Sequence, residues 1–514
     1  MNRYSDLEYL RLSRGQKFAY NFTSFFAGIP QALKNAGIGI GRFFQRIALA
    51  IGGEFADLYK TFRDGDWKTK SSYLVMGLGS IARGQVLRGL LFLLFELVFI
   101  VYMVLPQGGI FWLSKLDNLG DSGPHKEMVM QYGQSVETFV AGDNSFRILL
   151  YGVLTLFFIV ALIFTWRLNI KQNKIAEGIL KSGKPLRSGK DDLRSLVDDQ
   201  FHKTLLALPL TGILVFMVLP IFFMVLVAFT NYDAEHDGLN NLFTWVGLTN
   251  FNTMFSWSAG GKSYSAAFGE ILTWTLIWAF FATFTNYFLG MLVAMMINKK
   301  GIKLKKLWRT VLVLTIAIPQ FISLLYVSKM FAKNGLINLS LINLGWIQPG
   351  QELPFWEDPT WARITVILIN IWIGIPYLML IATGILMNIP ADLYESARID
   401  GANPVQQFTK ITLPYMLFIT GPYLLTSFTG NMNNFNVIYL LTGGGPTNAS
   451  ISTGGAAVGH TDLLITWLFK ITMEGGNKYY MASVVGILVF VVVALISLVV
   501  YSLLPSIKNE EDFQ

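Results

Sequence analysis

Apolar runs of about 20 residues recur along this chain, and each run is long enough to cross a lipid bilayer as an α-helix. Charged residues make up only 14% of the 514 residues and hydrophobic residues 53%, which is far from the balance of an ordinary soluble domain. The sequence therefore predicts an all-α, polytopic membrane protein. Eight transmembrane helices are expected, at residues 86–105, 146–166, 205–229, 269–297, 310–331, 363–387, 416–441 and 481–504.

The basic residues of the connecting loops predict the orientation. Residues 167–203 contain nine Lys and Arg residues, residues 299–309 contain six, and residues 1–85 contain twelve. They number only two, one and one in residues 106–145, 230–268 and 332–362. By the positive-inside rule, both termini of this multi-pass chain are expected on the cytoplasmic side of the cell membrane. The basic residues that give the chain its net charge of +8 gather in these loops. We therefore expect the chain to contact a lipid bilayer and no nucleic acid.

The expected spans predict the organisation of the chain. Residues 1–85 hold no span, because Lys34, Arg42 and Arg46 interrupt the apolar stretch 18–51. Phe18, Phe22, Phe25, Phe43 and Phe44 alternate with cations there, which favours amphipathic helices on the cytoplasmic membrane face or cytosolic helices packed on the rest. The expected parts are 1–85, accessory spans and a basic loop in 86–204, a third span in 205–230, a core domain in 268–504, and a cytoplasmic tail in 505–514.

No catalytic chemistry is indicated by the residue pattern. The chain has no cysteine, and its four histidines are scattered over different loops, so we expect no catalytic residue, metal site or cofactor. Glu96 lies inside the first expected span, where a carboxylate either makes a structural hydrogen bond or takes part in transport. An ion-driven secondary transporter is one alternative class, but it needs more such residues or broken helices in repeated halves.

The loop between the sixth and seventh spans, residues 390–414, is polar and contains strong helix signals. Pro390 suits a first helical turn, and Gly401 can take the left-handed conformation that ends a helix. A second helix is expected to begin at Asn403-Pro404, a capping residue followed by proline. The loop is therefore predicted to form two short helices around a glycine turn, as a docking element would.

This loop resembles the signature loop of permease subunits of bacterial ABC importers, which has the pattern E-(A/S)-A-x3-G-x9-I-x-L-P. Ser396 in place of the usual alanine is the one departure. In that family the loop is a coupling helix that inserts into a cleft of the ATPase subunit. The resemblance implies that the ATPase-coupling residues are Glu395, Ser396, Ala397, Asp400, Gly401, Ile411, Leu413 and Pro414.

Two expected spans each carry polar residues on one helical face. In the sixth span these residues are Asn370, Gly374 and Tyr377, with Ile373 beside them. In the seventh span they are Ser427, Gly430, Asn431 and Asn434. Asparagine inside a membrane is costly unless it has partners or lines a wet cavity. Amides, a hydroxyl and an aromatic ring suit a neutral sugar, and packing between helices is the alternative.

These stretches, with Leu441-Thr442-x-Gly444-Gly445-Pro446, resemble the larger, MalF-like permease subunit of maltose/maltodextrin importers over roughly residues 205–504. The resemblance implies that the eight residues of the two polar faces line a sugar site at mid-membrane. Gly430 departs from the family, because an aromatic residue can stand there.

The resemblance implies a permease that imports malto-oligosaccharides and makes no covalent change itself. The implied partners are a second, MalG-like permease subunit, two copies of an ABC ATPase that hydrolyses ATP, and an extracellular sugar-binding protein. An ABC importer for another oligosaccharide is the second alternative, because all such sugars offer hydroxyls to the same amides.

Overall fold

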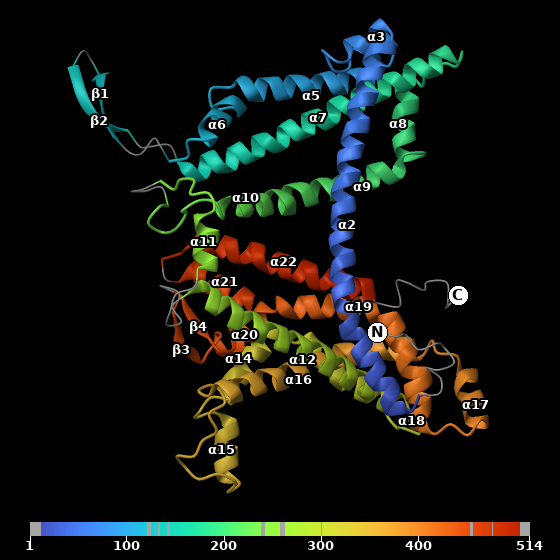
Figure 1. Ribbon diagram of the computed structural model, residues 1–514, viewed down its shortest axis with the longest axis vertical. Helices are drawn as coiled ribbons and strands as arrows, with labels where there is room; N and C mark the ends of the chain where they lie inside the picture. The colour runs from blue at the N-terminus through green and yellow to red at the C-terminus, as the bar shows by residue number, and fades with distance from the viewer. Residues whose placement is uncertain are drawn as a thin grey trace. The chain divides into compact units, whose positions relative to one another are not determined.

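The computed structural model describes residues 12–120, 125–131, 134–140, 144–237, 242–256, 263–299, 301–452, 456–474 and 476–503 (Figure 1). The chain divides into two units. The N-terminal unit holds residues 40–250 and 478–484, and the C-terminal unit holds residues 1–39, 251–477 and 485–514. The expected tail 505–514 lies outside the described residues.

Seven helical segments of the described chain are long and apolar enough to cross a membrane. They are Val86–Val104, Ser145–Lys181, Phe201–Val227, Tyr264–Asn298, Pro359–Leu386, Pro404–Thr442 and Tyr479–Tyr501. A bent pair of helices makes an eighth when it is counted as one span. The predicted helical membrane fold is therefore confirmed.

The predicted span at 310–331 is formed by two helices with a sharp bend between them. Helices α13 (Lys305–Ala317) and α14 (Gln320–Met330) meet at an angle of 91°. Pro319 lies between them and has no N–H with which to continue α13. Ile318 is extended, with ψ 127°, as the residue before a proline prefers.

Residues 14–64 form a single helix, α2 (Arg14–Asp64), where the sequence predicted several amphipathic helices. Phe44, Ile51, Phe55 and Tyr59 recur on one face of α2, and all four are exposed. An exposed apolar face of this kind is typical of helices that lie on a membrane surface. That location remains a prediction, and the side chains of Phe18, Phe22 and Phe25 lie outside the described part.

The N-terminal unit contains the C-terminal part of α2 and a set of shorter elements around α7 (Figure 1). These elements are α3 (Trp67–Ser71), α4 (Leu78–Ala82), α5 (Val86–Val104), α6 (Gly109–Leu116), β1 (His125–Gln131), β2 (Gln134–Val140), α7 (Ser145–Lys181), α8 (Gly189–Val197), α9 (Phe201–Ile213), a π-helix (Leu214–Val218) and α10 (Leu219–Val227). Strands β1 and β2 pair antiparallel as a hairpin that the sequence analysis did not predict. Helix α7 continues about four turns beyond the expected span 146–166.

Arg83 lies at the centre of a buried polar cluster in this unit. Its guanidinium donates hydrogen bonds to Asp66 Oδ1 at 2.5 Å, Thr69 Oγ1 at 2.7 Å and Asn173 Oδ1 at 2.8 Å. The carboxylate of Glu177 is 3.8 Å from the guanidinium and accepts a hydrogen bond from Thr69. A buried charge needs such partners, and here they join the short helices α3 and α4 to α7.

Glu96 has a structural partner in the same unit. Its Oε2 accepts a hydrogen bond from the backbone N–H of Met76 at 2.8 Å. The next N–H, of Gly77, donates to Asn169 Oδ1 at 3.1 Å. Side chains of α5 and α7 thus hold the connection between α3 and α4, which favours the structural interpretation of Glu96 over a role in transport.

The first turn of the last helix, α22 (Tyr479–Leu503), belongs to the N-terminal unit. Tyr480 donates its backbone N–H to the carbonyl of Tyr232 at 3.0 Å, and the rings of Tyr479 and Tyr232 stack with centroids 4.7 Å apart. The Tyr232 ring also packs against Phe243, with centroids 4.5 Å apart. This turn therefore completes a core whose other residues are more than two hundred positions earlier in the chain.

The C-terminal unit is built around two long helices that pack together, α12 (Tyr264–Asn298) and α16 (Pro359–Leu386). Around them lie α15 (Leu336–Asn343), α17 (Ala391–Ile399), α18 (Pro404–Gln407), a π-helix (Phe408–Thr412), α19 (Leu413–Met432), α20 (Phe435–Thr442), β3 (Thr447–Ser452), β4 (Ala457–Gly459) and α21 (Leu464–Met473). Helix α11 (Thr249–Phe255) lies at the boundary between the two units. The ten residues of α21 are too few to span a membrane.

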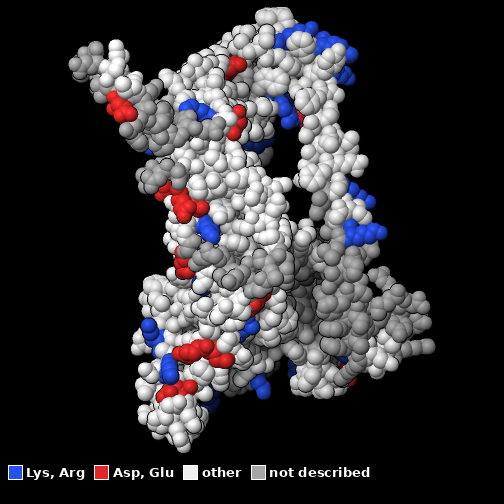
Figure 2. Space-filling view, turned by 60° about the vertical axis from the view of Figure 1, so that its left-hand side comes forward, with Lys and Arg blue, Asp and Glu red and all other residues white. Residues whose placement is uncertain are grey.

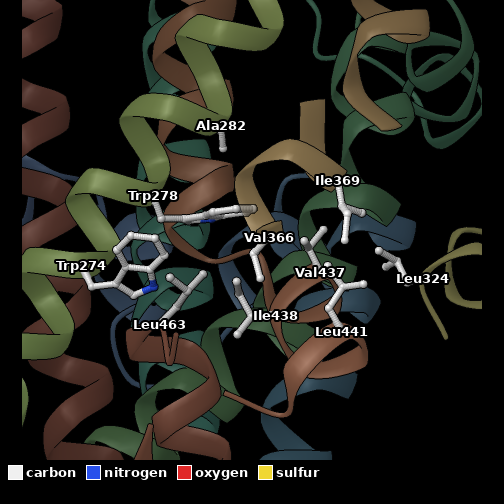
Figure 3. Close-up of a cluster of buried hydrophobic side chains, with 10 residues drawn as sticks. All are labelled: Trp274, Trp278, Ala282, Leu324, Val366, Ile369, Val437, Ile438, Leu441 and Leu463. Atoms are coloured by element: carbon white, nitrogen blue, oxygen red, sulfur yellow. The ribbon is translucent and has the colours of Figure 1, made fainter. Parts of the chain in front are cut away.

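Large apolar side chains fill the core of this unit between α12, α16 and α20 (Figure 3). Trp278 of α12 is fully buried, and Val366 of α16 and Ile438 of α20 lie beside it. In a membrane, such close contacts hold helices together by dispersion. The core keeps α12, α16 and α20 in a fixed relation, and four of the predicted polar-site positions lie on α16.

Basic side chains gather at one end of the N-terminal unit. Figure 2 shows Lys and Arg at the top of the view, the end that holds α3 and the last turns of α7. The basic loop 167–203, on which the predicted orientation depends, begins within α7.

Candidate functional site

The polar residues of the sixth span lie on α16 in three different environments. Asn370 is buried, and its Nδ2 has no hydrogen-bond partner in the part of the chain that the structure describes. Gly374 is in contact with the side chain of Asn286 from α12, and a Cβ at position 374 would collide with that amide. Tyr377 is 53% exposed. The predicted face of α16 thus contacts the Asn286 amide at Gly374 and exposes the ring of Tyr377.

The polar residues of the seventh span lie at the junction of α19 and α20, which breaks the expected span 416–441 at Asn433. Asn431 donates from Nδ2 to Thr283 Oγ1 at 3.0 Å, and its carbonyl accepts from Trp278 Nε1 at 3.0 Å. Asn434 caps α20 through its Oδ1, which accepts from the N–H of Val437. Both asparagines therefore have structural partners, as the packing alternative requires.

Ser427 and Gly430 complete the predicted set on α19. Ser427 is half-buried, whereas Gly430 is exposed and has no neighbouring atom within 4 Å of the position a Cβ would take. An aromatic side chain therefore has space at position 430, where the family can carry one.

A cavity of about 380 Å³ opens where α13 and α14 bend toward α16. Two residues of the predicted set, Ile373 and Tyr377, line it together with Trp372. The other wall is the bend itself, which contributes Thr315, Ile316, Ala317, Ile318, Pro319, Gln320 and Ser323. The remaining six predicted residues are not part of this lining, so the structure brings only part of the predicted site together.

The sequence analysis missed the polar residues that face this region from other helices. Gln320 and Ser323 line the cavity from the bend, and Pro319 indicated a kink there but not its angle. Asn286 was visible as an amide within the apolar stretch 269–297, and its buried Oδ1 has no hydrogen-bond partner among the described residues. Unpartnered amide atoms on Asn286 and Asn370 can bind water or a polar ligand, because leaving them unsatisfied is costly.

The loop 390–414 has the predicted helix–turn–helix form. Helix α17 ends before Gly401, which has φ +77°, and the N–H of Ala402 closes the turn on the carbonyl of Ala397 at 2.8 Å. Asn403 caps α18 by a reciprocal capping box with Gln406, and Pro404 occupies the first turn. Helix α17 begins directly after Pro390, as predicted, with Pro390 as its N-cap and Ala391 as its first residue.

Five of the eight predicted coupling residues lie in the first helix and turn of this loop, whereas Ile411, Leu413 and Pro414 lie at its end. Glu395, Ser396, Asp400 and Gly401 are exposed, and Ala397 is partly covered. Later in the loop, Phe408 packs against the core, and the hydroxyls of Tyr394 and Thr412 lie 2.8 Å apart. The loop is thus anchored at its second helix and presents its first helix and turn to a partner.

Comparison with known proteins places the chain in a family. Residues 286–509 match the family described as "Binding-protein-dependent transport system inner membrane component". The "Maltodextrin transport system permease protein MalC" of Streptococcus pneumoniae is 34% identical over 447 residues, which cover 85% of this chain and 96% of that protein. The chain belongs to this family of permease subunits. It is accordingly a transport protein and not an enzyme, and the ion-driven alternative is wrong.

Two further relatives differ in their named substrates. The "Galactooligosaccharides transport system permease protein GanP" of Bacillus subtilis is 31% identical over 438 residues, 85% of this permease and 97% of that protein. The "Maltose/maltodextrin transport system permease protein MalF" of Escherichia coli is 35% identical over 257 residues, 49% of this permease and 48% of that protein.

A buried ion pair organises the segment of the permease that follows α20. Lys470 Nζ lies 2.7 Å from Asp462 Oδ2, and the Asp462 side chain is fully buried. Asp462 also accepts from the N–H of Gly459 at 2.7 Å and from Thr466 Oγ1 at 2.9 Å. Burial raises the pKa of the Asp462 carboxyl above its usual value, while Lys470 and these hydrogen bonds act in the opposite direction.

Gly444, in the Gly444-Gly445-Pro446 segment, fits against this pair. Gly444 has φ +87°, and a Cβ there would collide with the carboxylate of Asp462. Position 444 therefore needs glycine both for its backbone conformation and for the space beside the ion pair.

Proposed function

We propose that the permease is the larger membrane subunit of an ABC importer for malto-oligosaccharides. The cavity between the α13–α14 bend and α16 carries the proposal, because it combines the Tyr377 ring with the Gln320 amide and the Ser323 hydroxyl. An aromatic ring and neutral hydrogen-bonding groups suit a sugar, and none of the lining residues is charged. The names of the MalC and MalF relatives support maltodextrin, and GanP makes galacto-oligosaccharides the second candidate.

We also propose that the loop 390–414 couples the permease to ATP hydrolysis. Its exposed Glu395 and Gly401 would meet a cleft of an ABC ATPase on the cytoplasmic side, as the family resemblance implies. A second permease subunit, two ATPase copies and an extracellular binding protein complete the proposed importer. The anchored second helix of the loop supports this role, because a firmly held element can transmit motion to the spans.

Tyr377→Ala is the sharpest test of the sugar site. Loss of the ring should weaken the apparent affinity for maltotriose uptake by about 10- to 100-fold, as expected when a buried sugar contact worth ~1–3 kcal/mol is lost. The exposed ring makes few packing contacts, so the amount of protein in the membrane should not change. Radiolabelled uptake in cells that express the whole importer gives the measurement.

Tyr326→Ala is the matched control, because Tyr326 is an exposed tyrosine of α14 that does not line the cavity. It should transport as the wild type does. Equal uptake by the Tyr377 and Tyr326 variants would reject the sugar site. Wild-type uptake of a galacto-oligosaccharide with none of maltotriose would instead establish the second candidate.

The orientation can be tested by single cysteines, because the natural chain has none. Lys184→Cys and Lys303→Cys should react with a membrane-impermeant maleimide only after the cells are permeabilised. Gln348→Cys should react in intact cells. All three side chains are exposed, so access to the reagent depends on the side of the membrane. The reverse labelling pattern would reject the cytoplasmic location of the loop 390–414.

A further inference from the structure

A groove lies between α2 and α7 in the N-terminal unit, whereas the proposed sugar site belongs to the C-terminal unit. Its volume is about 440 Å³, and both helices contribute along their facing sides. A second hollow of about 360 Å³ shares Asp57, Thr61 and Lys174 with the first, so the groove continues along the helix pair. Nothing in the proposed import function uses this groove.

One end of the groove is apolar and the other is charged. Phe164 and Leu168 of α7 line the apolar end, and the neighbouring Val160 and Ile163 leave an exposed apolar surface on the same helix. The charged end begins at Arg167, immediately after the apolar run of α7. An apolar surface that leads into basic residues matches an amphiphile with an acyl chain and an anionic headgroup.

The charged side chains that line the first hollow leave one positive charge without a counter-charge. Arg167 is paired with Glu54 at 2.5 Å, and Lys174 with Asp57 at 2.5 Å. Lys171 lies between these pairs on α7 and has no ion pair or hydrogen bond among the described residues. A phosphodiester, with one negative charge, would balance the charge of Lys171.

The hydroxyl of Thr61 gives an independent indication of a ligand. Thr61 is only 6% exposed, lines both hollows, and its Oγ1 has no hydrogen-bond partner among the described residues. A buried hydroxyl without a partner costs free energy, which a phosphate oxygen in the groove would recover. We propose that the groove between α2 and α7 binds the phosphate of an anionic phospholipid, with Lys171 and Thr61 as its ligands and the acyl chain along α7.

The test uses the full chain in phosphatidylcholine nanodiscs that contain increasing fractions of phosphatidylglycerol. Native mass spectrometry counts the phosphatidylglycerol molecules retained by the wild type, Lys171→Gln, Thr61→Val and the control Lys184→Gln. Lys184→Gln removes the same charge from an exposed position outside the groove, and it should behave as the wild type does. The two groove variants should need about 10-fold more phosphatidylglycerol for equal retention, as expected for the loss of one hydrogen bond or ion pair to phosphate.

Thr61→Val separates lipid binding from folding. Valine has nearly the shape of threonine, and Oγ1 makes no hydrogen bond within the described protein, so the thermal unfolding midpoint in phosphatidylcholine alone should be no lower than that of the wild type. Equal phosphatidylglycerol retention by the wild type and both groove variants would overturn the proposal. Displacement of phosphatidylglycerol by inorganic phosphate would also overturn it, because the groove would then select a free anion and not a lipid.

Discussion

Lys470→Met should destabilise the permease by about 3–5 kcal/mol, because it leaves the buried Asp462 carboxylate without its cation. The thermal unfolding midpoint of the purified chain, followed by tryptophan fluorescence, should fall well below that of the wild type. The difference in unfolding midpoint between Lys470→Met and the wild type should become smaller as the pH falls, because protonation of Asp462 removes its uncompensated negative charge.

The double variant Asp462→Asn, Lys470→Met distinguishes charge from packing. It replaces the ion pair by two neutral side chains of similar size and should recover much of the lost stability. If Lys470→Met unfolds at the wild-type midpoint, the ion pair does not stabilise this segment. If the double variant is as unstable as the single one, packing around Lys470 is responsible, and not charge.

Gly401→Val should separate the ATPase from the permease while leaving the permease in the membrane. The backbone at Gly401 has φ +77°, which a β-branched residue adopts only at a cost of ~1–2 kcal/mol. The new side chain would also project from the exposed turn that is proposed to enter the ATPase. Purification through a tag on the permease should recover several-fold less ATPase, and sugar-stimulated ATP hydrolysis should fall by ~10-fold or more for a lost contact worth 1.4 kcal/mol or more.

Gly183→Val is the matched control for this variant. Gly183 also has a positive φ, of +75°, and no atom within 4 Å of its Cβ position, but it follows α7 in another loop. It carries the same backbone strain without altering the loop 390–414. ATPase retention and stimulation should therefore be close to wild type in Gly183→Val. Equal losses in both variants would mean that strain, and not docking, disturbs the complex.

The spans could be predicted because each depends on a local property, the length of an apolar run. The bend between α13 and α14 could not be predicted from that property, because the apolar run continues through Ile318 and Pro319. Proline inside a membrane helix is often tolerated, so its presence alone does not distinguish a kink from a 91° break. The neighbouring helices decide that outcome, and they are distant in the sequence.

The predicted sugar site shows the same limit at the level of single residues. Helical periodicity correctly grouped Asn370, Gly374 and Tyr377 on one face of α16. Periodicity could not show that Asn431 would bind Thr283 of another helix, or that Asn434 would cap α20. The loop 390–414 was predicted more fully, because its caps and turn depend on contacts between residues only three to five positions apart.

The contact between Tyr232 and the start of α22 has a consequence for biosynthesis. A growing chain emerges from the ribosome in order, and domains usually fold in the order of their synthesis. Here the core of the N-terminal unit cannot be completed before Tyr479 and Tyr480 have been synthesised. These two residues are translated only after nearly all of the C-terminal unit. A nascent chain that stops before α22 therefore lacks residues of both units. Neither unit is complete until this last helix has been synthesised.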